Sequence, residues 1–212
     1  MGNLSRLWLL TVVVGYAALQ AWELSFSSLL MLAQGPDAFF PPFGPKYARL
    51  WGWVVTHGVS ACLLLSLGPV LLFRQYLPLP QGWHALFGKA YLALSCVAIL
   101  SGIPLSIQAE GGWLASLSFL TLSVVWAWAS YGVFRTARRR QFGRHQQWVW
   151  FHYALAFSAV FLRIGLGIAA YLDYEVHQVS AAVGWLSWQP ALLYAWRVGL
   201  LTKARLTPTL AR

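Results

Sequence analysis

The sequence predicts an all-α polytopic membrane helix bundle, with residues 1–212 forming a single integral membrane domain. Of the 212 residues, 59% are hydrophobic and 9% are charged, whereas a soluble domain carries about 25% charged residues. The mean hydropathy is +0.60. The chain also holds 13 Trp, 9 Tyr and 12 Phe, and such rings favour the two membrane interfaces. This composition excludes a soluble enzyme and a nucleic-acid-binding domain.

Six apolar stretches are long enough to cross a bilayer, which takes roughly 20 residues. They are residues 7–33, 50–73, 83–107, 113–134, 148–171 and 179–201. The first is longer than the core of a signal peptide, so we expect an uncleaved helix. Gln189 and Pro190 interrupt the last stretch and predict a kink or the end of its first half.

The orientation follows from the loop charges. The segment between the fourth and fifth stretches carries five arginines, and such clusters stay on the cytoplasmic side. They are Arg135, Arg138, Arg139, Arg140 and Arg144. Alternation of six spans then places both termini in the cytoplasm (N-in, C-in). We expect a multi-pass protein of the bacterial inner membrane, whose net charge of +10 reflects this orientation rather than nucleic-acid binding.

Ionisable residues inside the predicted spans are the main candidates for function, since each costs roughly 2.5–3.5 kcal/mol to insert. In the fifth stretch, His152 and Arg163 follow His145 by 7 and 18 residues. At about 100° per residue these three side chains share one stripe. In the third stretch, His84 and Tyr91 share a face with small residues, and Lys89 is a further polar candidate.

Helical depth sorts these residues into two clusters. We expect an inner cluster of His84, His145 and His152 near the cytoplasmic face, and an outer cluster that contains Glu23, His57 and Arg163. Two level imidazoles on separate helices match the axial ligation of a b-type haem, with His84 and His145 as the metal ligands. Copper binding by the same side chains and a structural role at the membrane interface both stay open.

The outer cluster has two interpretations. It is either a site that handles protons or quinone, or an ion pair of Glu23 with Arg163 that serves the structure alone. The sequence contains no nucleotide-binding glycine loop and no hydrolase motif, so catalytic residues stay unassigned.

The chain resembles an uncharacterised bacterial family of polytopic membrane proteins, domain of unknown function 2306. The matching pieces begin with His57-Gly58, the run from His84 to Tyr91, Gly143 to Trp148, and Leu162-Arg163. They continue with Gly68-Pro69, Ser101-Gly102, Ser187-Trp188 and Trp196. This resemblance implies that His57, His84, His145 and Arg163 occupy the family's matching positions, whereas His152 replaces a small residue.

The chain is more distantly similar to four-histidine membrane proteins of terminal-oxidase maturation and to cytochrome b561-type bundles. Unlike cytochrome b561-type bundles, the chain lacks a second pair of histidines that lie at the same depth in the membrane. We therefore expect a redox protein that exchanges electrons through haem with quinone or a partner membrane complex. The alternative is a non-catalytic accessory subunit that handles haem or copper for a respiratory or other membrane complex. A small transporter has less support.

Overall fold

A computed structural model describes residues 33–35, 48–74, 80 and 82–201 of the chain, and the structural statements below concern these residues. The regular elements are all helical, with no strand among the described residues. They are α3 (Trp51–Leu72), α4 (Trp83–Ile107), α5 (Gly112–Arg138), α6 (Phe142–Ala156), α7 (Ser158–Tyr171), α8 (Val176–Ser187) and α9 (Gln189–Arg197).

Four stretches of helix are long and apolar enough to cross a membrane. They are α3 with 22 residues, α4 with 25, α5 with 27, and α6 together with α7 with 30. Since a span takes roughly 20 residues, the described part alone is that of a multi-pass membrane protein. Large apolar side chains also cover its outside, for example Trp113 at 73% exposure and Val124 at 69%.

The predicted stretches agree with these helices to different degrees. Residues 83–107 coincide with α4, which follows Gly82 in the left-handed region at φ +93°. The fourth prediction ends four residues too early and the fifth begins six residues too late, because Arg135, Arg138 and Arg144 lie in helical turns rather than in a loop. Cations at the last turn of α5 favour its continuation through the helix dipole.

The last predicted stretch folds as two short helices. α8 ends at Ser187 and α9 begins at Gln189, so the break predicted from Gln189 and Pro190 is present. Residues 7–32 of the first predicted stretch, with Glu23, lie outside the described residues.

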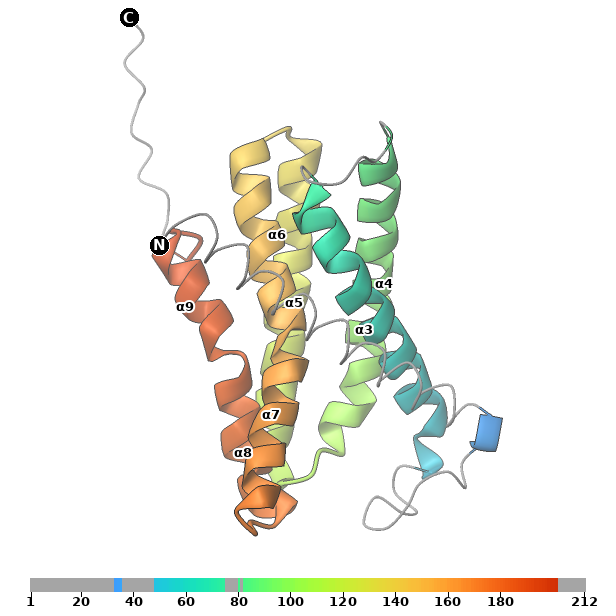
Figure 1. The fold of residues 1–212 in the computed structure, drawn as a ribbon, viewed down its shortest axis with the longest axis vertical. Helices are drawn as coiled ribbons and strands as arrows, with labels where there is room; N and C mark the ends of the chain where they lie inside the picture. Colours follow the sequence, from blue (N-terminus) through green and yellow to red (C-terminus); the bar gives the residue numbers. More distant parts are fainter. Residues whose placement is uncertain (1–32, 36–47, 75–79, 81, 202–212) are drawn as a thin grey trace, which may run out of the picture.

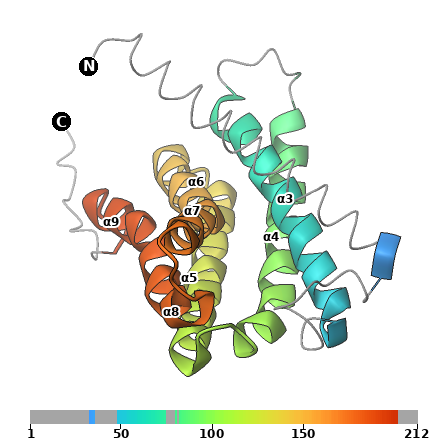
Figure 2. The ribbon, with the colours of Figure 1, turned by 60° about the horizontal axis from the view of Figure 1, so that its bottom comes forward.

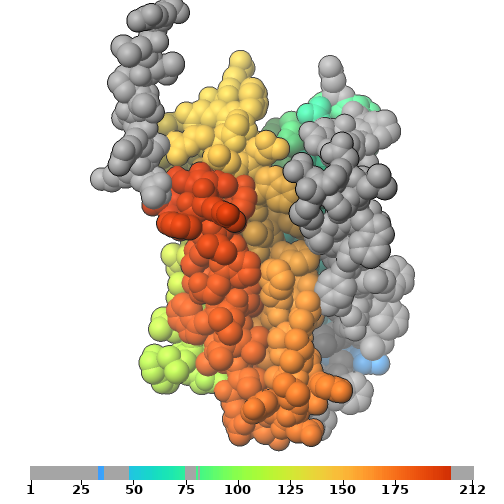
Figure 3. Space-filling view, turned by 60° about the vertical axis from the view of Figure 1, so that its left-hand side comes forward, coloured from blue at the N-terminus to red at the C-terminus, as the bar shows by residue number. Residues whose placement is uncertain are grey.

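The helices lie side by side along the long axis of the molecule (Figure 1). α3 packs against α4, and α5 packs between α4 and α6. A second view separates α3 and α4 from the group formed by α5 to α9 (Figure 2). α8 and α9 run beside α7 and α6 on one face of the molecule (Figure 3).

Small residues allow these helices to approach closely, as is usual in lipid. Ala98 and Ala129 are completely buried in the core. Gly132 of α5 faces the indole ring of Trp148 in α6, and a Cβ atom at this position would overlap that ring. The α5–α6 contact therefore depends on the absence of a side chain at residue 132.

Candidate functional site

Two predicted haem ligands lie at the same end of the bundle, His84 in the first turn of α4 and His145 in the first turn of α6. The Nδ1 atom of His145 is 3.1 Å from the carbonyl oxygen of Val133 in α5. A carbonyl only accepts, so Nδ1 carries the proton and Nε2 keeps its lone pair. Thr136 Oγ1 lies 3.4 Å from the same Nδ1 atom. The ring of His145 is thus oriented with one nitrogen available to a ligand.

His84 is a half-buried imidazole with an unsatisfied nitrogen. Its Nδ1 atom is buried and has no hydrogen-bond partner among the described residues. His84 lies at the same end of the bundle as His145, since each histidine is in the first turn of its helix. A buried polar atom without a partner is costly. Of the two imidazoles at this end of the bundle, that of His84 therefore has a buried nitrogen without a hydrogen-bond partner among the described residues.

His152 is completely buried in the centre of the bundle. Its Nδ1 atom is 2.9 Å from the hydroxyl oxygen of Tyr91, and its Nε2 atom is 3.0 Å from Oγ of Ser130. Ser130 donates its only hydroxyl proton to the carbonyl of Trp126. Its oxygen therefore accepts from Nε2–H, and Tyr91 donates to Nδ1. These hydrogen bonds assign one tautomer to His152, and they occupy both of its nitrogens.

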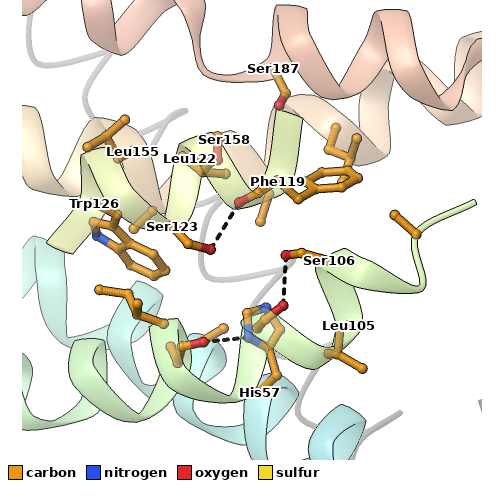
Figure 4. A pocket seen from close by; sticks show the side chains of 18 of the residues that line it. His57, Leu105, Ser106, Phe119, Leu122, Ser123, Trp126, Leu155, Ser158 and Ser187 are labelled. Atoms are coloured by element: carbon orange, nitrogen blue, oxygen red, sulfur yellow. Dashed lines mark hydrogen bonds between the residues drawn. The ribbon is translucent and has the colours of Figure 1, made fainter. Parts of the chain in front are cut away.

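His57 lies toward the opposite end of the bundle and points into a cavity between α3, α4 and the group of α5 to α8 (Figure 4). Its Nδ1 atom donates to the carbonyl oxygen of Ala98 over 2.9 Å, so its Nε2 atom keeps a lone pair. Gly102 makes room for this ring, because an added Cβ would lie 3.2 Å from Nδ1. The ring orientation of His57 is thus set by α4.

The cavity has a volume of about 460 Å³ and mostly apolar walls, which include Leu64, Leu122 and the ring of Trp126. Its polar groups are His57, Glu110 and several serines. Serine hydroxyls of the wall donate to carbonyls of their own helices. They are Ser106 to Gly102, Ser123 to Phe119, Ser180 to Val176 and Ser187 to Gly184. These four hydroxyls therefore use their protons within the wall and keep only acceptor lone pairs for whatever fills the cavity.

The model of one protein family matches residues 54–198, which is more than half of the chain. Its description is "Predicted membrane protein (DUF2306)". The chain belongs to this family. The resemblance inferred from the sequence motifs is thereby confirmed, and the match includes His57, His84, His145 and Arg163. No curated protein and no solved structure matches the chain, so the more distant resemblances stay predictions.

The structure brings only some of the candidate residues of this family member together. The outer cluster of Glu23, His57 and Arg163 stays a prediction, since Glu23 lies outside the described residues. Arg163 is exposed, with Nη1 3.4 Å from the carbonyl oxygen of Ala159, whereas His152 is completely buried. The common stripe of His145, His152 and Arg163 stays a prediction, and its members differ in burial because different helices pack along its length. α3, α5 and α9 contact α6, whereas α8 contacts α7.

Other candidates have simpler surroundings. Lys89 is exposed, whereas Tyr91 is buried at 3% exposure against His152. Cys62 and Cys96 are not joined in a disulfide; Cys62 is buried and Cys96 is exposed. No group of three or more His, Cys, Asp or Glu side chains suitable for a metal ion lies within the described part of the chain.

Sequence reasoning missed Ser130, Thr136 and Trp126. Each contacts a histidine of another helix, and no local motif marks such a contact. The indole Nε1 of Trp126 is also buried without a hydrogen-bond partner among the described residues, although its ring lines the cavity. The small and hydroxylated residues along α5 are the one sequence signal that indicates a polar helix interface there.

Proposed function

We propose that the protein is a redox protein of the bacterial inner membrane, in which His84 and His145 ligate a b-type haem and the cavity beside His57 binds quinol. The observation that supports this most directly is the buried Nδ1 of His84, which has no hydrogen-bond partner among the described residues and lies at the same end of the bundle as His145. Coordination to the iron of haem would give the imidazoles of His84 and His145 a partner. When bound, haem supplies reversible transfer of one electron.

The hydrogen bond of His145 also supports ligation. Metal-binding histidines almost always donate their other ring N–H to a carbonyl or a carboxylate, which fixes the tautomer and raises the basicity of the ligating nitrogen. His145 donates in this way to Val133. Two protein ligands suffice for haem, because the porphyrin supplies the equatorial nitrogens, and this favours haem over a copper ion held by side chains alone.

The cavity beside His57 suits a quinol in size and in chemistry. Ligand pockets commonly measure about 300–1,000 Å³ and combine apolar walls with a few oriented polar groups. Since His57 Nε2 and the serine oxygens accept hydrogen bonds, they match the hydroxyl groups of a reduced quinone. His57 would orient a bound quinol by accepting a hydrogen bond from one of its hydroxyl groups at Nε2.

We propose that the protein has six membrane spans and that both termini lie in the cytoplasm. α8 and α9 together would form the sixth span, which is broken between them. The charges of the described helix ends support this orientation. Five arginines surround the α5–α6 turn, whereas Glu110, Asp173 and Glu175 lie at the opposite end. The inner haem and the outer quinol site would then lie on opposite sides of the membrane centre.

The haem proposal predicts a b-type reduced-minus-oxidised difference spectrum for protein purified in mild detergent from haem-sufficient cells. His84→Ala or His145→Ala should abolish the spectrum, because each removes one of the two side chains that would hold the haem. His177→Ala is the matched control, since His177 is an exposed histidine at the other end of the bundle, and it should leave the spectrum unchanged. His152→Gln should also retain it, because hydrogen bonds occupy both nitrogens of His152.

A colourless preparation without metal would overturn the haem proposal. If that protein co-purified with a respiratory complex, the accessory-subunit hypothesis would replace it. Equal loss of the spectrum in His177→Ala would show a general loss of folding rather than ligation.

The quinol proposal predicts that a short-chain quinol raises the unfolding temperature of the protein, and that the oxidised quinone does so less. At 100 times its dissociation constant a ligand stabilises by about 2.7 kcal/mol. His57→Leu should remove most of this effect because it removes the accepting nitrogen. His177→Leu is the control. Equal stabilisation of both variants, or equal effects of quinol and quinone, would contradict the assignment without affecting the haem test.

A further inference from the structure

A second hollow of about 210 Å³ lies at the α5–α6 turn, far from the cavity beside His57. Its polar walls include Arg135, Arg139, Arg144 and Gln141, and its aromatic walls include Tyr131 and Trp148. The turn forms the yellow tip at the top of the space-filling view (Figure 3). Three guanidinium groups thus surround one small concave site at the end of two membrane-spanning helices.

The shape of this hollow is built into the packing of the turn. Only residues 139–141 separate α5 from α6, and Arg140 adopts φ 54° in this tight connection. Gln141 N–H donates to the carbonyl of Thr136 over 3.0 Å. Trp148 lies against Gly132, and its ring meets that of Trp128 edge-on at a centroid distance of 4.8 Å. The arginines and the aromatic rings that line the hollow therefore lie on this short turn and on the ends of the two helices that it joins.

The positive charge of the arginines around the hollow favours the binding of an anion. Arg135, Arg139 and Arg144 are all exposed. The carboxylates in the described part of the chain, Glu110, Asp173 and Glu175, belong to the connections at the other end of the bundle. Guanidinium groups bind phosphate oxygens through paired hydrogen bonds, so a phosphate group matches this site.

The neighbouring surface indicates that the phosphate belongs to a lipid. Val124, Trp128 and Tyr131 lie on one face of α5, since they are spaced by four and three residues. Their side chains are 69%, 41% and 57% exposed. Trp128 and Tyr131 also line the hollow, so one continuous surface leads from the arginines into the apolar zone. An acyl chain attached to the bound phosphate would lie along it.

We propose that this hollow binds the phosphate of an anionic phospholipid, with an acyl chain on the exposed face of α5. The hollow shares no lining residue with the cavity beside His57, whereas Thr136 of its wall also lies 3.4 Å from Nδ1 of His145. The lipid proposal rests on the arginines and on the exposed face of α5, and it needs neither haem nor quinol. Anionic lipids in basic pockets at helix ends are a common mode of lipid recognition.

The test uses the full-length protein in mild detergent, with bound lipid counted by native mass spectrometry. The titrants are dioleoylphosphatidylglycerol, dioleoylphosphatidylcholine and inorganic phosphate. The double variant Arg139→Gln/Arg144→Gln should bind phosphatidylglycerol about 30-fold more weakly, since each arginine near an anionic headgroup contributes about fivefold. The control Arg138→Gln/Arg140→Gln removes the same charge from the same turn outside the hollow, and should bind like the unmodified chain.

Preferential binding of phosphatidylglycerol that only the first variant loses would support the site. Equal binding of the two lipids, or equal loss in the two variants, would overturn it in favour of a diffuse charge effect. Displacement of the lipid by millimolar inorganic phosphate would show a phosphate site without lipid specificity and would overturn the lipid assignment. All four substituted side chains are exposed, so the unfolding temperatures should stay close to that of the unmodified protein.

Discussion

Replacement of His152 with alanine is expected to lower the free energy of unfolding by about 3–5 kcal/mol. The imidazole is completely buried and packs against the rings of Tyr91 and Trp126 at centroid distances of 5.0 and 5.6 Å. Its removal leaves a cavity and deprives the buried Tyr91 hydroxyl of its acceptor. Both effects destabilise the bundle, because no water is available at this depth to replace the lost partner.

The two cysteines provide a direct measurement of this loss. Cys62 is 2% exposed, whereas Cys96 is exposed. In a Cys96→Ala background, reaction of Cys62 with a fluorogenic maleimide during titration with sodium dodecyl sulfate reports unfolding. His177→Ala is the control and should change the free energy by less than about 0.5 kcal/mol. A loss below about 1 kcal/mol for His152→Ala would contradict the buried network.

A double-mutant cycle separates the hydrogen bond from the packing. Tyr91→Phe keeps the ring and removes the hydroxyl donor of His152 Nδ1. In membrane proteins such bonds are worth about 0.6 kcal/mol on average and up to about 1.7. In the presence of His152→Ala, the additional cost of Tyr91→Phe should disappear. An unchanged cost would mean that the Tyr91 hydroxyl does not stabilise the protein through His152.

The second large effect is expected at Gly132, where alanine should destabilise the protein by about 1–3 kcal/mol. The added Cβ overlaps the ring of Trp148, which is fixed by Trp128 and Phe151 on its other sides. The ring cannot move away without disturbing the α5–α6 contact. Unfolding monitored through Cys62, as above, measures this cost.

Gly88→Ala is the matched control for this substitution. Gly88 also lies inside a long helix, but no atom lies within 4 Å of an added Cβ. Alanine is there expected to be neutral or to stabilise by up to about 1 kcal/mol, since it is the better helix former. If both variants behaved alike, the close approach of α5 and α6 at Gly132 would be wrong.

The sequence determined the membrane class and the extent of several helices, because both follow from local properties. A chain with 9% charged residues has too few of them to form the surface of a water-soluble domain. In lipid, the N–H and C=O groups of a long apolar run can all form hydrogen bonds within that run only if it is a helix. Gly82 before α4 and Pro190 at the start of α9 are visible in the sequence and lie where one helix begins and another is broken. His84 and His145 lie at the same end of the bundle because each is in the first turn of a helix that begins there, which span counting predicts.

The tertiary structure alone decided what each polar side chain contacts. Helical phase places His152 and Arg163 on one stripe, but different helices pack against α6 and α7, so that His152 is buried and Arg163 is exposed. The hydrogen bonds of His152 join α4, α5 and α6, with partners 61 and 22 residues away. Periodicity describes one helix at a time, whereas a buried hydrogen bond depends on the distance and rotation between helices, which packing sets.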